Sequence, residues 1–173
     1  MNTGNRKKDW ARPFIWSALL LVIVAGWFWY RQATWETRMR KVQHVNCINN
    51  MKQLGLGLRI WQGDYDGKCP FEVSTNAGGV MELVTTKNGP LQNGYLVIQC
   101  ASNEMMVPLI AVCPQDNTKS VAKDWSSFTA SNFSYVFPMT NDVLLVCPVD
   151  GNVLHSDGTV TDKHGKILPA GSQ

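Results

Sequence analysis

The sequence predicts an α+β fold in which one long N-terminal helix, transmembrane at first and amphipathic further on, packs on a small antiparallel β-sheet. Three observations support this prediction: an uncharged apolar run over residues 14–30, apolar residues at helical spacing over 31–62, and short strand-like runs between turn residues over 63–162. Residues 1–13 form a basic tail before the span, and residues 163–173 are expected to be a mobile tail.

Residues 14–30 have the composition of a transmembrane helix. The run holds 17 residues without a charge and would extend about 25 Å as a helix, at the short end of membrane-spanning length. Nine of these residues are Phe, Ile, Leu or Val, so insertion into a bilayer is favoured by about 3–5 kcal/mol in total. Aromatic residues flank the run as in interfacial belts: Trp10 and Trp16 at one end, and Trp27, Trp29, Tyr30 and Trp35 at the other.

Two other interpretations of this run are weaker. A cleaved secretory signal would use Val24-Ala25-Gly26 as its cleavage site, but the apolar run continues beyond that site to Tyr30. A buried core helix is disfavoured because the run is apolar on every face. The basic residues that flank the span are equal in number on its two sides, so their count does not set the orientation. The short N-terminal tail favours an orientation with the N-terminus inside. The flanking basic residues are Arg6, Lys7, Lys8 and Arg12 before the span, and Arg31, Arg38, Arg40 and Lys41 after it.

Residues 31–62 are expected to continue the span as an amphipathic helix, because no proline separates Phe14 from Gln62. Gly55 and Gly57 would each weaken this helix by about 1 kcal/mol relative to alanine, so we expect another element to approach closely there. The helix should end in the turn residues 63–67. Its apolar stripe recurs at steps of three and four: Val42, Val45, Ile48, Met51, Leu54, Leu58 and Trp61.

The remainder of the domain is predicted to be an antiparallel sheet. Asp157-Gly158 lies between two short β-prone runs and indicates a hairpin with a type I′ turn. Further strands are expected where β-branched and aromatic residues lie between Gly, Asn, Asp and Pro clusters, at residues 95–100, 109–113, 133–137, 143–147 and 152–155.

The five cysteines do not show the spacing of a metal site. They would permit two disulfides and one free thiol in an oxidising compartment, but none forms a C-x-x-C pair. Buried apolar residues or disulfide partners are therefore the favoured interpretation over metal ligands, and the disulfide pairing stays open. The cysteines are Cys47, Cys69, Cys100, Cys113 and Cys147, of which Cys69, Cys113 and Cys147 precede a proline.

Other candidate sites give no support for an enzyme. Asp64-x-Asp66-Gly67 matches only part of a calcium loop and is interpreted as a turn, and the three histidines are expected to be scattered on the surface. No nucleophile elbow surrounds Ser126-Ser127, and no glycine-rich phosphate loop occurs. We therefore expect no catalytic, cofactor or metal residues and no small-molecule substrate. The remaining candidates are His44, His155 and His164, and the carboxylates Asp150, Asp157 and Asp162 that could surround a cation.

The net charge of +3 arises from Lys and Arg near the span, which suits lipid headgroups rather than nucleic acid. The expected partners are therefore the bilayer and other proteins.

Four blocks of sequence stand in order over residues 42–161. The first block is Cys47-Ile48-Asn49-Asn50-Met51-Lys52-Gln53-Leu54-Gly55-Leu56-Gly57-Leu58, followed by Asp64-Tyr65-Asp66-Gly67-Lys68-Cys69-Pro70. The others are Val112-Cys113-Pro114-Gln115-Asp116, Ser131-Asn132-Phe133-Ser134-Tyr135-Val136, and Gly151-Asn152-Val153-Leu154-His155-Ser156-Asp157-Gly158-Thr159-Val160. Together they resemble bacterial type IV pilin-like proteins and type II secretion pseudopilins that have a C-terminal D-G hairpin.

The resemblance implies a pilin-like fold and a protein that works in secretion or pilus-type machinery by assembly with other pilin-like subunits. It also implies an inner-membrane, single-pass anchor with the C-terminal domain on the periplasmic side. One departure matters: Gly4 is not followed by the prepilin peptidase motif, and the apolar run lacks its glutamate. Three alternatives stay open: a membrane-tethered redox domain, a tethered metal-binding domain, and a scaffold or sensor that keeps the fold without forming a filament.

Overall fold

The structure is a computed structural model that describes residues 11–86, 89–140 and 142–168. The chain divides into two compact units, residues 1–41 and residues 42–173. The basic residues Arg6, Lys7 and Lys8 and the flanking Trp10 lie outside the described residues, as do residues 169–173.

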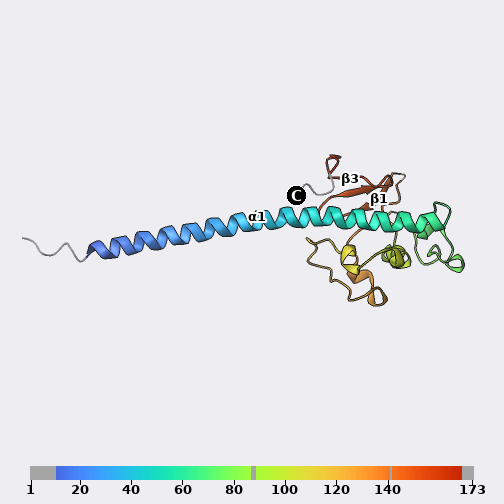
Figure 1. Ribbon diagram of the computed structural model, residues 1–173, viewed down its shortest axis with the longest axis horizontal. Coiled ribbons are helices and arrows are strands. Elements are labelled where there is room, and N and C mark those ends of the chain that lie inside the picture. The colour runs from blue at the N-terminus through green and yellow to red at the C-terminus, as the bar shows by residue number, and fades with distance from the viewer. Residues whose placement is uncertain (1–10, 87–88, 141, 169–173) are drawn as a thin grey trace, which may run out of the picture. The chain divides into compact units, whose positions relative to one another are not determined.

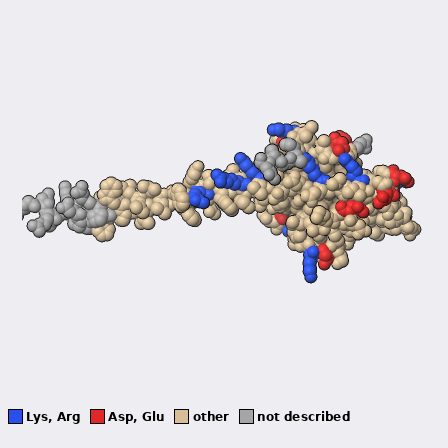
Figure 2. All heavy atoms as spheres, in the orientation of Figure 1, with Lys and Arg blue, Asp and Glu red and all other residues tan. Residues whose placement is uncertain are grey.

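The first unit consists of the beginning of helix α1, which runs without a break over Ala11–Asp64. Over residues 14–30 the large apolar side chains are exposed on every side of the helix. Phe14, at the start of this run, is 67% exposed, and Tyr30, at its end, is 69% exposed. This helix is long and apolar enough to cross a membrane. In Figure 2 the segment shows an uninterrupted uncharged surface that is followed by a group of basic side chains.

The rest of α1 forms the centre of the second unit, where one stripe of its side chains is buried. Ile48, Met51, Leu54, Leu58 and Trp61 of the predicted stripe are buried, together with Cys47. Val42 and Val45 are exposed, so the predicted stripe was wrong at these two positions, which precede the packed part of the helix. The prediction that the helix ends in the turn residues is confirmed.

Gly55 and Gly57 lie where other segments approach α1 closely, as predicted. A methyl group added at Gly55 would lie 2.8 Å from Cδ2 of Leu154, and one added at Gly57 would lie 2.8 Å from Cγ of Met105. Positions two apart point in nearly opposite directions, about 200° around a helix. The two glycines therefore admit segments on opposite sides of α1, as Figure 1 shows for the sheet and the segments before it.

The sheet has three antiparallel strands in the order β1-β2-β3: β1 at Val143–Val146, β2 at Val153–His155 and β3 at Val160–Thr161. Val146 pairs with Val153, and Leu154 pairs with Val160. The fold is therefore α+β with a small antiparallel sheet, as predicted.

The β2–β3 hairpin is present, but its predicted turn type was wrong. The N–H of Gly158 donates to the carbonyl of His155 at 2.9 Å, and the N–H of His155 donates to the carbonyl of Thr159 at 2.9 Å. Gly158 has φ +87°, whereas Ser156 and Asp157 keep negative φ. This is a type I turn followed by a glycine bulge, because a three-residue loop places the glycine after the turn and not inside it.

Three predicted strands are not strands. Residues 95–100 form helix α2 at Tyr95–Cys100, and residues 109–113 lie largely in a 3₁₀ turn at Pro108–Ala111. Residues 133–137 contribute only an isolated bridge between Val136 and Val146. In all three segments consecutive residues are buried without a period of two, for example Val97 with Ile98, and a short apolar run of this kind does not distinguish strand from helix.

Much of the second unit is built from 3₁₀ turns, which besides Pro108–Ala111 lie at Pro70–Glu72, Thr75–Ala77, Ser102–Glu104, Trp125–Ser127 and Ala130–Asn132. The expected mobile tail begins with an ordered segment. Thr161 bridges to Ile167, and the N–H of Leu168 donates to the carbonyl of Val160 at 2.7 Å. These contacts extend the edge of the sheet beyond β3.

Candidate functional site

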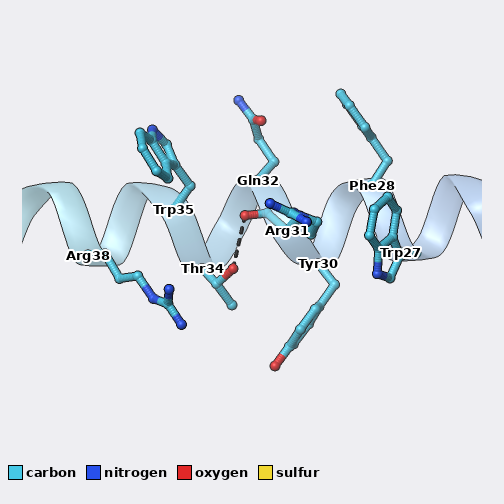
Figure 3. Close-up of a pocket in the computed structure, with 8 residues that line it drawn as sticks. All are labelled: Trp27, Phe28, Tyr30, Arg31, Gln32, Thr34, Trp35 and Arg38. Carbon is cyan, nitrogen blue, oxygen red and sulfur yellow. Dashed lines mark hydrogen bonds between the residues drawn. The ribbon is translucent and has the colours of Figure 1, made fainter.

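A collar of aromatic and polar side chains lies where the apolar run on α1 ends. We define the collar as Trp27, Phe28, Tyr30, Arg31, Gln32, Thr34, Trp35 and Arg38, whose side chains point away from the helix in several directions (Figure 3). The guanidinium carbon of Arg31 lies 5.1 Å from the ring centre of Trp27, close enough for a cation–π contact. Indole and guanidinium groups beside an apolar run suit the headgroup region of a bilayer.

In the second unit, three cysteines distant in sequence meet in the core. We call Cys47, Cys113 and Cys147 the thiol cluster. Their sulfur atoms all lie within 4.8 Å of one another, and each side chain is at most 1% exposed. All three are free thiols. Cys47 comes from α1, Cys113 follows a 3₁₀ turn, and Cys147 follows β1, so only the folded domain brings them together.

Side chains on both sides of Cys47 attach α1 to the two loops that bring the other thiols. Asn50 Nδ2 donates to the carbonyl of Val112 at 3.1 Å, next to Cys113. His44 Nδ1 lies 2.7 Å from Oδ2 of Asp150, in the loop after Cys147. Residues three apart share one face of a helix, so positions 44, 47 and 50 point together toward these loops.

Peptide N–H groups are directed at the loop sulfurs. The N–H of Asp150 donates to Cys147 Sγ at 3.4 Å, and the N–H of Val149 also lowers the pKa of that thiol. The hydrogen bond with Cys147 raises the pKa of Cys113 to about 11, and the N–H of Gln115 acts against this rise. Hydrogen bonds from the thiols of Cys113 and Cys47 lower the pKa of Cys147 most, so Cys147 is the cluster member that ionises first.

The phenol of Tyr135 completes the surroundings of the thiol cluster. Its hydroxyl is buried, and among the described residues the sulfur of Cys47 is its one hydrogen-bond partner. Burial raises the pKa of Tyr135, and the neighbouring sulfurs of Cys47, Cys113 and Cys147 raise it further. Sulfur is a weak hydrogen-bonding group, so a stronger partner for this oxygen would be favourable.

Asp150 is the centre of a polar network at the edge of the cluster. Besides His44, it accepts hydrogen bonds from Gln115 Nε2 at 3.0 Å and from Asn152 Nδ2 at 2.9 Å. Its side chain is only 10% exposed. Each of its donors comes from a different segment, so this one carboxylate links α1 to the loops that carry Cys113 and Cys147.

The other residues singled out from the sequence are not gathered into one site. Asp66 lies in the turn that ends α1, at φ 54°, and Asp157 and Asp162 accept hydrogen bonds from N–H groups of their own turns. His155 Nε2 lies 2.9 Å from the hydroxyl of Thr161, far along the chain from His44. Ser126 and Ser127 hydrogen-bond to Asp124 in a 3₁₀ turn. Among the described residues, the thiol cluster is the one group of His, Cys, Asp or Glu side chains close enough to share a metal ion.

Spacing could not have revealed the cluster, because Cys47, Cys113 and Cys147 lie in three different segments of the sequence. The available signal was indirect: Cys113 and Cys147 each precede a proline, and Cys47 and Cys113 lie in two of the blocks quoted for the sequence resemblance. Cys69 and Cys100 lie apart from the cluster, Cys69 beside Gln62 Nε2 at 2.9 Å and Cys100 beside the carbonyl of Gly78 at 3.1 Å.

Comparisons with protein-family models, with curated proteins and with solved structures find no match. What the protein does must therefore be argued from its own residues.

Proposed function

We propose that the chain is a membrane-anchored, pseudopilin-like component of a bacterial type II secretion or pilus-type machinery, which acts by assembling with other subunits and not by catalysis. The observation that carries the proposal is the continuity of α1 over Ala11–Asp64. Its first part exposes apolar side chains on every face, and its last part is the buried centre of a separate domain. A helix of this kind joins a bilayer anchor directly to a domain that can contact other proteins.

The placement of the sequence blocks supports the resemblance. The block at residues 47–58 lies where α1 is packed, with Gly55 against Leu154 of β2. The block at residues 151–160 forms the β2–β3 hairpin. These two blocks therefore meet where the helix packs on the sheet, as expected for a family that packs a long helix on a sheet.

The proposal places the span in the inner membrane and the second unit on the periplasmic side. Without the peptidase motif after Gly4 and without a glutamate in the span, the chain is proposed to remain anchored beside the machinery. A scaffold or sensor would keep the same anchor and domain but would not contact pilin-like subunits.

Photo-crosslinking in native membranes tests assembly. A photoreactive residue replaces Leu21, which is 68% exposed on the apolar run, and a matched chain has it at Leu83, which is 52% exposed in the second unit. The proposal expects protein adducts of discrete mass from position 21. Lipid adducts alone from position 21 and no protein adduct from position 83 would contradict assembly.

Intact mass and N-terminal sequence of the extracted protein then separate two forms of the proposal. A chain that starts at Met1 establishes a permanently anchored relative. A new terminus after Gly4 with a methylated amine establishes a filament subunit.

Anchoring itself is tested with Val22→Arg, since an arginine at the centre of a span costs about 2.5–3.5 kcal/mol. Val22→Ile is the matched control, and only the arginine variant should be released by alkaline carbonate.

A further inference from the structure

We propose that Cys47, Cys113 and Cys147 bind one zinc ion in a closed structural site, with the hydroxyl of Tyr135 as the fourth ligand. The inference concerns the second unit alone and does not depend on the proposed function. It departs from the expectation of no metal site, which was drawn from cysteine spacing along the sequence and not from distances in the fold.

The spacing of the sulfurs fits a small thiophilic cation. Zinc binds thiolates at about 2.3 Å, so two sulfurs of a tetrahedral site lie about 3.8 Å apart. The three sulfurs here already lie within 4.8 Å of one another on three separate segments. Rotamer adjustments of less than about 1 Å would therefore close them around one ion.

A peptide N–H points at the cluster, since that of Asp150 donates to Cys147 Sγ at 3.4 Å. Thiolates bound to a metal keep negative charge and accept such hydrogen bonds, whereas the neutral sulfurs of a disulfide gain little from them. Binding releases to solvent the protons that the thiols still carry, and Zn²⁺ with three thiolates has one net negative charge, less than that of a four-cysteine zinc site.

Tyr135 is a second observation that favours a ligand. Its side chain is 3% exposed, it adjoins the three sulfurs, and among the described residues its hydroxyl meets only the sulfur of Cys47, a weak hydrogen-bond partner. A zinc ion would be a stronger partner for this oxygen, and its positive charge would compensate for the burial of the polar group. Since no thiol of the cluster is more than 1% exposed, the site is closed to substrate and its role is structural.

A zinc ion here would fasten α1 to both cysteine loops. Cys47 is the ligand on the helix, between His44 and Asn50, which already hold Asp150 and the carbonyl of Val112. These two contacts hold the segments that carry Cys113 and Cys147 beside Cys47 before any ion binds.

The test uses the full chain, purified in detergent without added metal. Zinc content is measured by mass spectrometry, and Co²⁺ is exchanged in to report geometry. The expected results are one zinc per chain, five free thiols after denaturation with a chelator, and thiolate-to-cobalt charge-transfer bands with the intense visible bands of a tetrahedral ion. Three free thiols and no metal, with peptide mass spectrometry placing the disulfide between two cysteines of the cluster, would overturn the proposal, and so would five free thiols that bind neither Zn²⁺ nor Co²⁺.

Variants locate the ion. Cys113→Ser should weaken Zn²⁺ binding by at least about 100-fold, because loss of an outer-shell group alone costs about 10–100-fold. Cys69→Ser is the matched control, since Cys69 is buried at 7% exposure but lies outside the cluster, and it should retain one zinc per chain. Tyr135→Phe should keep the three-thiolate charge transfer and change the visible cobalt bands. Unchanged bands in Tyr135→Phe would remove tyrosine from the ligand set, and loss of zinc from Cys69→Ser would place the ion elsewhere.

Discussion

A methyl group added at Gly55 tests the packing of α1 on the sheet. The new Cβ would lie 2.8 Å from Cδ2 and 3.4 Å from Cδ1 of Leu154, a side chain with 0% exposure. Alanine is favoured over glycine in a helix by about 1 kcal/mol, whereas overpacking a core costs about 1–3 kcal/mol. Gly55→Ala should therefore lower the free energy of unfolding by about 0–2 kcal/mol.

The same substitution should have the opposite sign once Leu154 is shortened. Leu154→Ala alone should cost about 2–5 kcal/mol, because it opens a cavity in the core. In that background the added methyl group meets no clash, so Gly55→Ala should stabilise the domain by about 1 kcal/mol. The coupling free energy between the two substitutions is then about 1–3 kcal/mol, which exceeds the deviation of about 0.3–0.5 kcal/mol that independent sites show from additivity.

Urea unfolding of the four chains in detergent measures this cycle. The signal is near-ultraviolet circular dichroism, to which Trp61 contributes through its stacking on Tyr65, with ring centres 3.8 Å apart. Gly63→Ala is the matched control, because a methyl group there meets nothing within 4 Å and should not couple to Leu154. Equal effects of Gly55→Ala in both backgrounds would refute the packing of this glycine against β2.

Three further predictions follow from the polar groups and thiols. Asp150→Ala should destabilise the domain by about 1–3 kcal/mol, because His44 and two other donors lose their acceptor, and the shift in urea midpoint measures this loss. Hydrogen bonds from neighbouring groups hold the pKa of Asp124 and Asp157 below the ordinary 3.8. The two carboxylates therefore contribute fully to the free energy of unfolding above that pH, and this contribution is lost as the pH falls through their lower folded-state pKa. Unfolding curves measured with a chelator present at pH 7, 5 and 3 should therefore weaken only at the lowest pH, and a steady decline from pH 7 would contradict the assignment. Burial raises the pKa of Cys69 to about 11, so at pH 8 iodoacetamide should alkylate it much more slowly in the native chain than in urea, as peptide mass spectrometry would show.

The elements that the sequence predicted well depend on local and regular patterns. Helix α1 follows from an uncharged apolar run and from steps of three and four, and both patterns recur over several turns. Strands β1, β2 and β3 follow from β-branched runs next to a D-G turn. The close approaches at Gly55 and Gly57 could be predicted because glycine weakens a helix and needs a compensating contact.

The predictions that failed concern segments whose structure depends on distant neighbours. Residues 95–100 are apolar enough for a strand, but Val97, Ile98 and Ala101 are buried on one helical face, where the surrounding core encloses them. The turn at Asp157-Gly158 depended on loop length, which changed the position of the glycine relative to the turn.

By itself, the sequence determined that a single long helix combines an apolar run with an amphipathic stripe, because helical periodicity and hydrophobicity are properties of consecutive residues. Only the tertiary structure decided that Cys47, Cys113 and Cys147 meet, with Tyr135 beside them and Asp150 holding their segments together. The physical reason is that sulfur atoms from segments far apart in the chain approach one another only after the core has packed, and no spacing along the chain encodes that distance.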